Sequence, residues 1–268
     1  MLSLSLLKIK LFITVLIVSS FVQAESFDRV GDNELSFFSY KPIYFGSTTY
    51  HSDSNNTGES KYQFSFKYEL FHESSIYMAY TQKTIWSTQA AAGPIKETNF
   101  TPEVFYGLKL ESDVVPYIQF GIFKHHSNGE EKPNNLYWNT NYIEPLFKYE
   151  EYTIRLTIWS AFLFQSKGSA SGGNGQLFEY YGKGEIEVAY DMENGDKHTI
   201  LYREGSIGGV YALKYQWEID INNLFGGGVD KNGWNTKFFV QAFNGYGETL
   251  ANYNNSVTRV TVGISITQ

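Results

Sequence analysis

Three polar residues in the middle of the chain have types and a spacing that suit ester hydrolysis. His125 lies two residues before Ser127, and Asn139 follows twelve residues after the serine. Residues i and i+2 of an extended chain point the same way, so His125 and Ser127 can share one face of a strand, and Asn139 can join them from the next. Ser127 would be the nucleophile, His125 the general base and Asn139 the group that holds the imidazole in the required tautomer.

The same segment offers a donor for the oxyanion that forms when a serine attacks an ester. Gly129 follows Ser127 by two residues, and its backbone N–H is open to close approach because glycine has no Cβ. Spacing alone leaves a second interpretation open, in which His125, Ser127 and Asn139 are ordinary polar residues of an external loop and a strand end. The elements that position these side chains decide between the two.

The first residues have the pattern of a secretory signal peptide. Lys8 and Lys10 precede an apolar run over residues 11–21, and the small residue Ala24 ends the segment. We expect cleavage after Ala24, which leaves residues 25–268 as one barrel domain. The alternative, a single membrane anchor, is disfavoured because the apolar run is short for a bilayer span.

Charge and composition exclude several classes of protein. Without the first 24 residues, 19 Lys and Arg stand against 28 Asp and Glu, a net charge of −9. Nucleic-acid binding is not expected, because it requires a basic surface. The chain has no cysteine, so neither disulfides nor a thiolate nucleophile are available. Tyr and Phe number 21 each and Gly 24, which favours short strands with aromatic girdles.

Alternating apolar and polar residues predict strands through most of the mature chain. In residues 211–221, Tyr, Leu, Trp and Ile at odd positions alternate mainly with Lys, Gln, Glu and Asp, and residues 61–71 follow the same pattern. A soluble β-sandwich also alternates. Here, however, the polar face carries charges on nearly every strand, and the apolar face is large and aromatic. That combination favours a barrel in a lipid bilayer, apolar outside and polar inside.

We predict an all-β fold, a transmembrane barrel of about twelve antiparallel strands with short periplasmic turns and longer extracellular loops. The predicted strands are residues 35–46, 60–71, 75–87, 103–111, 114–124, 136–148, 151–165, 178–191, 196–205, 210–221, 234–245 and 257–267. The longer polar loops are residues 47–59, 88–102, 125–135, 166–177 and 246–256. Residues 222–233 are an exception, because this connection is long for a periplasmic turn.

The strand before His125 has the wrong phase for a site that faces lipid. Residues 118, 120 and 122 form its apolar face, and strict continuation of this alternation turns His125 and Ser127 toward the lumen. One extra residue, a β-bulge near residues 123–124, reverses the phase, and bulges are common at barrel rims and active sites. We therefore predict a bulge there. Asn139 needs no bulge to face lipid, because it lies on the same face of its strand as the apolar Ile143.

A set of longer motifs supports the catalytic interpretation. H-x-S-N-G at residues 125–129 is followed by W-N at residues 138–139. Further motifs are Y-T-Q-K at residues 80–83, E-T-N-F at 97–100, G-Y-G-E at 245–248 and T-R-V at 258–260. With these motifs the chain resembles outer-membrane phospholipase A, the family of barrel-shaped lipases of Gram-negative outer membranes, over nearly the whole mature sequence.

The resemblance implies a twelve-stranded barrel that hydrolyses phospholipid acyl esters in the outer leaflet of the bacterial outer membrane. It implies that Ser127 is the nucleophile, His125 the base and Asn139 the orienting residue. It also implies that activity depends on Ca²⁺ and on a homodimer, which completes the substrate cleft and the metal site.

Calcium is where the chain departs from the family pattern. The family's metal ligands correspond to the backbone carbonyl of Glu130, to Asn135 and, from the partner chain, to Ala92. Asn135 can offer an oxygen, but Ala92 has no side-chain ligand, and residues 166–176 lack the carboxylate that the family carries there. Glu130 and Glu131 can compensate as oxygen donors, or they are solvated loop charges.

Gln82 is the predicted dimer contact. It lies on the apolar face of the strand over residues 75–87, and an amide that faces hydrocarbon without a partner costs about 2 kcal/mol or more. A second chain could satisfy this amide, and the resemblance favours this, because the matching glutamine of the family lies in the dimer interface. Water at the membrane interface is the alternative. Two rival functions remain open: a non-enzymatic structural or channel barrel that retains the motif, and an esterase with a different lipid or mode of activation.

Overall fold

The computed structural model describes residues 37–51, 57–88, 95–131, 134–161, 176–221, 223 and 235–267. The predicted signal peptide, residues 1–24, lies outside these ranges. The elements are β1 (Phe37–Ser39), β2 (Ile43–His51), β3 (Thr57–Glu69), β4 (Ile76–Ser87), β5 (Ile95–Lys109), β6 (Tyr117–Ser127), β7 (Tyr137–Tyr149), β8 (Tyr152–Ala161), α2 (Leu177–Tyr181), β9 (Gly184–Asp191), β10 (Lys197–Glu204), β11 (Tyr211–Asp220), β12 (Asn235–Gly245) and β13 (Val257–Thr267). Within the described ranges, no helix is both long and apolar enough to cross a membrane.

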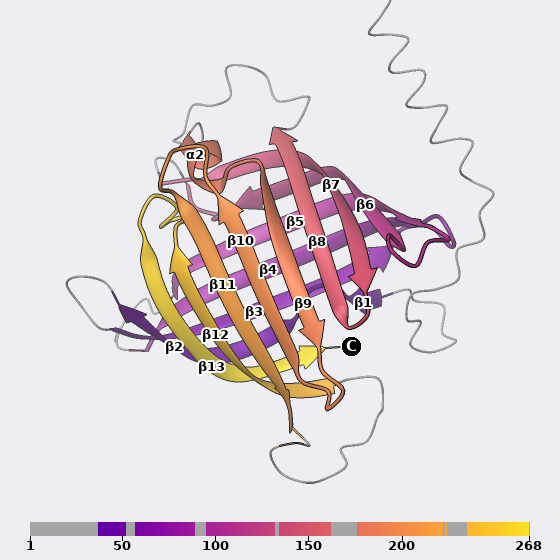
Figure 1. Ribbon diagram of the computed structural model, residues 1–268. Helices are drawn as coiled ribbons and strands as arrows, with labels where there is room; N and C mark the ends of the chain where they lie inside the picture. Colours follow the sequence, from indigo (N-terminus) through magenta and orange to yellow (C-terminus); the bar gives the residue numbers. More distant parts are fainter. Residues whose placement is uncertain are drawn as a thin grey trace, which may run out of the picture. The chain divides into compact units, whose positions relative to one another are not determined.

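The strands form one closed antiparallel sheet (Figure 1). From β2 onward each strand pairs with its neighbour in sequence, and β13 closes the barrel by pairing with β2. Both β1 and β2 pair with β3, β1 opposite its last residues and β2 opposite its first. The two are therefore one interrupted strand, and the predicted all-β barrel of twelve strands is confirmed.

Proline interrupts this first strand. Pro42 lacks an N–H and cannot donate to the ladder, and side chains of β3 take over the pairing. The Lys41 N–H donates to Ser65 Oγ at 3.2 Å, and Gln63 Nε2 donates to the Pro42 carbonyl at 2.9 Å. The break turns Lys41 toward the inside of the barrel, where it lines a cavity together with residues of β6 to β10.

The two faces of the sheet differ as predicted. Large apolar side chains stand on the outer face, among them Phe45, Phe64 and Ile264, each more than half exposed. The inner face is polar: Glu103 and Arg259 are 1% and 3% exposed. Lipid can cover the outer side chains, whereas the inner ones need the hydrogen bonds and ion pairs that the lumen supplies.

An aromatic row marks the end of the barrel at the tight turns. Tyr152 pairs with Tyr190, their rings 4.9 Å apart, and His198 pairs with both Tyr190 and Trp217 on the neighbouring strands. His198 Nδ1 also forms a 2.8 Å hydrogen bond with the hydroxyl of Tyr215. Amphipathic rings of this kind sit at the boundary between hydrocarbon and head groups.

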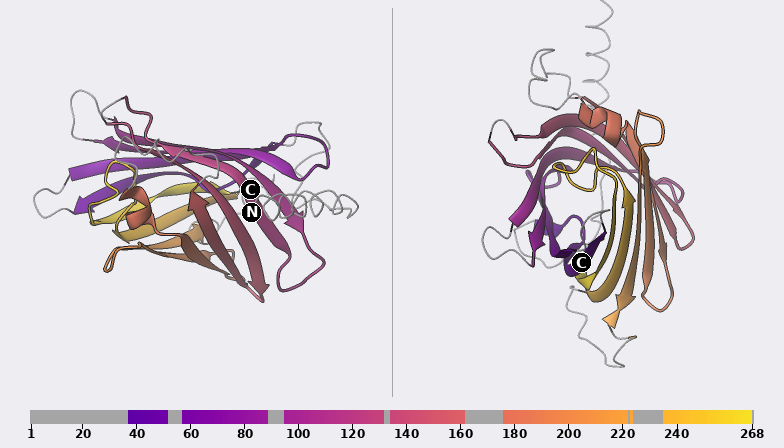
Figure 2. Two further views of the ribbon diagram at one scale, coloured as in Figure 1. Left: turned by 90° about the horizontal axis from the view of Figure 1, so that it is seen from above. Right: turned by 90° about the vertical axis from the view of Figure 1, so that its left-hand side faces the viewer.

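The connection between β12 and β13, residues 246–256, folds into the barrel opening (Figure 2, right). Glu248 forms a 2.6 Å ion pair with Lys61 and a second pair with Arg259, and all three side chains are at most 3% exposed. The Leu250 N–H donates to Asn99 Oδ1 at 3.2 Å. Buried ion pairs need such additional hydrogen bonds, so lumen and loop stabilise each other.

Some predicted boundaries were wrong. β5 begins at Ile95, eight residues before the predicted start, and β6 continues to Ser127, inside a predicted loop. Part of the strand predicted over residues 178–191 is the short helix α2. The lumen-facing polar residues of β5 bind the loop at residues 246–256, and such a long-range contact extends a strand beyond its locally apolar part.

Candidate active site

The predicted bulge is confirmed, one residue earlier than expected. Gly121 pairs with Tyr142 and Lys124 with Thr140, so three steps along β6 match two along β7. The extra residue lies at residues 122–123, and the side-chain amide of Asn141 donates to the freed carbonyl of Ile122. The phase of β6 reverses here.

After the bulge, His125 and Ser127 face outward. Lys124 and His126, which alternate with them, line a cavity inside the barrel. Side chains of adjacent residues in a strand point to opposite faces. The two residues with the predicted chemistry are thus on the outer face of the wall, the face that carries the exposed apolar side chains.

His125 and Asn139 are directly opposite each other on β6 and β7. Nδ1 of His125 lies 2.6 Å from Oδ1 of Asn139. An amide oxygen only accepts, so Nδ1 carries the hydrogen, and Nε2 keeps a lone pair that can accept a proton. The imidazole is therefore held in the tautomer of a general base.

Ser127 lies two residues beyond His125 on the same face, and its partner on β7 is Tyr137. Both Ser127 and His125 are described, and no hydrogen bond joins their side chains in this structure. The two Cα positions are about 6.7 Å apart along a strand, a distance that a serine and a histidine side chain can bridge by rotation. Catalytic hydrogen bonds often tighten only when substrate is bound.

Aromatic side chains surround the serine and the histidine, a feature that the sequence analysis missed. The His125 ring stacks on Phe123 at 6.4 Å and contacts Tyr137 at 6.0 Å. Phe100 of β5 pairs with Ser127 from the other side. Phe123 and Tyr137 occupy odd positions, as His125 and Asn139 do, and this shared parity could have predicted that they lie on the same face. The prediction also requires the exact position of the bulge. This apolar surround suits an acyl chain.

The loop after β6 is held by Asn128, whose role the sequence analysis also missed. Its Oδ1 accepts from the backbone N–H groups of Leu136 at 2.9 Å and Glu130 at 3.3 Å, and its Nδ2 donates to the Asn134 carbonyl at 2.9 Å. An asparagine that bonds to nearby backbone in this way stabilises a turn. Asn128 thus fixes the position of Gly129 relative to the serine.

Gly129 needs to be glycine at this position. Its φ is +70°, and a Cβ would lie 2.5 Å from the ring of Phe100. Left-handed backbone disfavours other residues, and the aromatic ring leaves no space. Gly129 follows Ser127 by two residues, and its backbone N–H stays the predicted oxyanion donor.

Replacing Gly129 with Ala is expected to lower kcat by about 100-fold, because strain and the contact with Phe100 displace the N–H donor. Initial rates of ester hydrolysis in detergent micelles measure the effect. Gly208→Ala is the matched control, because no atom lies within 4 Å of a Cβ at this turn glycine. Equal rates for the two variants would exclude Gly129 as part of the site.

The predicted calcium ligands are described only in part. Ala92 lies outside the described residues. Asn135 Oδ1 is buried and has no hydrogen-bond partner among the described residues, which is the expected condition of an oxygen that binds a cation. Glu130 is exposed in the same loop. Among the described side chains, no group of three or more Asp, Glu, His or Cys residues is arranged to hold a metal ion. A calcium site here would depend on backbone and amide oxygens, which Ca²⁺ accepts.

Gln82 lies on the outer face of β4, but the premise that its amide lacks a partner was wrong. The hydroxyl of Tyr80 donates to Gln82 Oε1 at 2.9 Å, and Gln82 Nε2 donates to Thr84 Oγ1 at 3.4 Å. The sequence analysis missed these bonds because they join residues two apart on one strand face. The amide therefore does not require a second chain to satisfy it.

Comparisons with known proteins match most of the chain. The family model described as Phospholipase A1 matches residues 23–266. Phospholipase A1 of Proteus vulgaris is 25% identical over 233 residues, 80% of this chain and 72% of the relative. Phospholipase A1 of Escherichia coli (strain K12) is 25% identical over 226 residues, 78% of this chain and 69% of the relative.

Two solved structures share the fold. Outer membrane phospholipase A from Escherichia coli superposes with a TM-score of 0.71 at 19% identity, over 87% of this chain and 99% of that one. The outer membrane phospholipase dimer of Salmonella typhi, with bound calcium, gives a TM-score of 0.72 at 20% identity, over 89% and 95% of the two chains. At these identities the likeness shows the barrel fold.

Proposed function

The chain belongs to the phospholipase A1 family, and from this premise we propose that Ser127 is its nucleophile, His125 its general base and Asn139 the residue that orients the histidine. The protein is a phospholipase of the outer membrane. The observation that carries the proposal is the 2.6 Å contact between His125 Nδ1 and Asn139 Oδ1, on the outer face that Ser127 shares. The substrates would be phospholipid acyl esters of the outer leaflet.

The proposed reaction has two halves. Ser127 Oγ attacks the acyl carbonyl carbon while His125 Nε2 takes the serine proton, and Asn139 holds the Nδ1–H. The oxyanion of the tetrahedral intermediate accepts a hydrogen bond from the backbone N–H of Gly129. Collapse breaks the ester bond, and His125 gives its proton to the departing lysophospholipid oxygen. Water, deprotonated by His125, then attacks the acyl-serine, releasing the fatty acid and returning the proton to Ser127.

We further propose that the loop at residues 128–136 binds calcium. The buried, unpartnered Oδ1 of Asn135 supports this, and the backbone carbonyl of Glu130 is the second candidate ligand. Calcium, when bound, would supply positive charge that polarises the ester carbonyl and stabilises the developing oxyanion. The acidic Glu130 and Glu131 add negative charge to the same loop.

The proposed active form is a homodimer. Gln82, Phe100 and Ser127 lie in one cross-strand row on the outer face, so Gln82 is about 10 Å from the serine, two strand spacings away. A second chain that packs against Gln82 would border the substrate site. Sedimentation in detergent, with calcium and with chelator, measures the fraction of dimer. Full activity of a preparation that stays monomeric would contradict the proposed dimeric active form.

The direct test of the function is release of fatty acid from phospholipid in mixed detergent micelles. We expect release in millimolar calcium and loss of it after chelation. Fatty-acid release that chelator leaves unchanged would contradict the proposed role of calcium. No release with or without calcium would contradict the proposed hydrolytic function.

Replacing Asn135 with Ala is expected to raise the calcium concentration for half-maximal activity by about tenfold or more, because an oxygen ligand is lost. Asn134→Ala is the matched control, because Asn134 contributes its backbone carbonyl and N–H to the loop. Calcium titrations of both variants measure the difference. The same calcium midpoint for both would exclude Asn135 as a ligand.

A further inference from the structure

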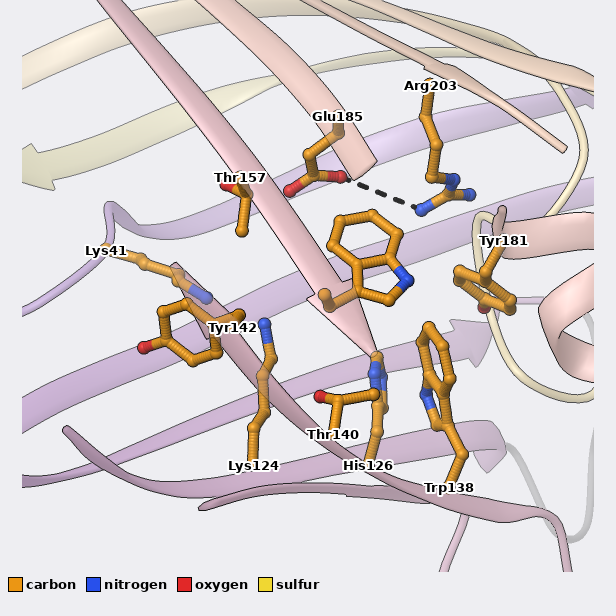
Figure 3. A pocket seen from close by; sticks show the side chains of 11 residues that line it. Lys41, Lys124, His126, Trp138, Thr140, Tyr142, Thr157, Tyr181, Glu185 and Arg203 are labelled. Carbon is orange, nitrogen blue, oxygen red and sulfur yellow. Dashed lines mark ion pairs between the residues drawn. The ribbon is translucent and has the colours of Figure 1, made fainter. Parts of the chain in front are cut away.

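A cavity of ≈ 170 Å³ lies on the inner side of the wall that carries the proposed catalytic residues. Lys124 and His126 of β6 line it, and they alternate with His125 and Ser127. Trp138 and Thr140 of β7 line it as well, and they flank Asn139. Figure 3 shows the side chains that line the cavity. Because adjacent residues of a strand point to opposite faces, the cavity and the proposed active site lie on the two faces of one pair of strands.

Positive charge predominates in this cavity. Lys41, Lys124 and Arg203 line it, and Glu185 is the one carboxylate among its lining residues. Arg203 Nη1 is 3.9 Å from Glu185 Oε2, a long ion pair. Lys41 Nζ is 3.7 Å from Glu103 Oε1. Glu103 and Glu144, which do not line the cavity, also attract Lys41 and Lys124, so the excess of positive charge is confined to the lining residues.

Lys124 forms no direct ion pair with a described carboxylate, although Glu103 and Glu144 attract it from farther away. In the described part of the chain no acidic oxygen lies within ion-pair distance of its ammonium group, whose recorded contact is the ring of Tyr142 at 5.4 Å. Figure 3 shows the side chains of Lys41 and Lys124 both pointing into the cavity. Lys124 is partly buried, and an ammonium group without a carboxylate at ion-pair distance can take an additional anion as a partner.

Two buried N–H donors also lack acceptors. Trp138 and Arg203 are 7% and 9% exposed, and within the described part of the chain neither Trp138 Nε1 nor Arg203 Nε has a hydrogen-bond partner. The other guanidinium nitrogens of Arg203 are engaged, with Nη2 donating to the carbonyls of Tyr246 and Gly247 at 3.1 and 3.0 Å. Buried donors normally have acceptors, so these two N–H groups indicate that an acceptor binds in the cavity.

The indole N–H of Trp159 differs from that of Trp138, because it has an acceptor. Trp159 lines the same cavity, but its Nε1 donates to the Gly182 carbonyl at 2.9 Å. One indole at this site is thus satisfied by the protein and the other is not. Burial alone therefore does not explain the free N–H of Trp138.

We propose that this cavity binds a small tetrahedral oxyanion such as inorganic phosphate. Such an anion offers several acceptor oxygens in a compact shape, which matches ammonium groups and N–H donors that come from different strands. The lipid lies on the opposite face of the wall, so a free anion fits the position better than a phospholipid head group. The bound anion would join β6 to β7 directly behind the proposed triad.

The test is binding of inorganic phosphate to the purified full-length barrel in a maltoside detergent, which carries no phosphate. A chelator is included so that no calcium phosphate forms, and Ser127→Ala is used so that hydrolysis plays no part. Isothermal titration measures affinity, and thermal unfolding measures stabilisation, which rises with the concentration of any ligand that binds the folded state. We expect saturable binding and a concentration-dependent rise in Tm.

Two variants locate the site. Lys124→Gln and Trp138→Phe are each expected to weaken phosphate binding by about tenfold or more, because each removes one donor to the anion. Their matched controls are Lys183→Gln, an exposed lysine that removes the same charge, and Trp159→Phe, which removes a donor that is already satisfied. Both controls are expected to keep the affinity of the parent protein.

Three outcomes would overturn the proposal. The first is no saturable phosphate binding. The second is binding that Lys124→Gln and its control weaken equally, which would indicate a long-range charge effect. The third is tighter binding of glycerophosphocholine than of phosphate, which would assign the site to a head group. Because binding is measured without turnover, these outcomes are independent of whether the protein hydrolyses phospholipids.

Discussion

Replacing Ser127 with Ala is expected to lower phospholipid hydrolysis by about 10⁴-fold or more, to the residual rate that binding and the oxyanion donor sustain. The serine oxygen is the proposed nucleophile, and no other hydroxyl shares the outer face with His125 on β6. Initial rates of fatty-acid release under saturating calcium measure the effect. Removal of the general base in His125→Ala is expected to have a comparable effect, because the two groups act as a unit.

Matched controls exist for both substitutions. Ser47 is an exposed serine of β2, and His198 is a histidine at the opposite, tight-turn end of the barrel, where it bonds Tyr215. Ser47→Ala and His198→Ala are expected to hydrolyse phospholipid at the parent rate. Activity of Ser127→Ala above a few per cent of the parent rate would exclude this serine as the nucleophile.

Replacing Glu248 with Gln is expected to lower the free energy of unfolding by about 3–5 kcal/mol, the usual cost of breaking a buried ion pair from one side. The carboxylate binds both Lys61 and Arg259 in the lumen. The substitution leaves these two cations with less compensation, and it also removes one of the contacts that hold the loop at residues 246–256. Urea or thermal unfolding in detergent measures the loss. Glu193→Gln, at an exposed turn position, is the matched control and should be neutral.

The pH dependence has a defined sign. Burial opposes ionisation of Glu248, but the charges of Lys61, Arg259 and Lys83 outweigh it and hold the pKa of Glu248 well below the ordinary 4.5. A carboxyl whose folded-state pKa is depressed stabilises the fold above the unfolded-state pKa, and that contribution is lost as the pH falls below it. The stability difference between the parent and Glu248→Gln should therefore shrink below pH 4.5. A difference that is constant from neutral to acid pH would exclude this ion pair as its source.

The sequence by itself determined the barrel and most of its strands. Alternation with a period of two, an apolar outer face and a charged inner face describe a sheet between lipid and a polar lumen, because only one side of such a sheet can be apolar. The conflict between the phase of β6 and an outward-facing His125 was enough to predict a bulge, since one extra residue is the smallest change that reverses a strand face.

Tertiary structure decided where the lumen and the loops stabilise each other. The early start of β5, the helix α2 and the position of Glu248 depend on contacts between residues far apart in sequence, which no local pattern contains. The partners of the Gln82 amide also appear only when the side chains of β4 are placed. For the proposed catalytic residues, the pattern of the sequence predicts their types and their order along two strands. The 2.6 Å contact of His125 with Asn139 and the cavity behind it arise from strand register, which is set by pairing across the whole sheet.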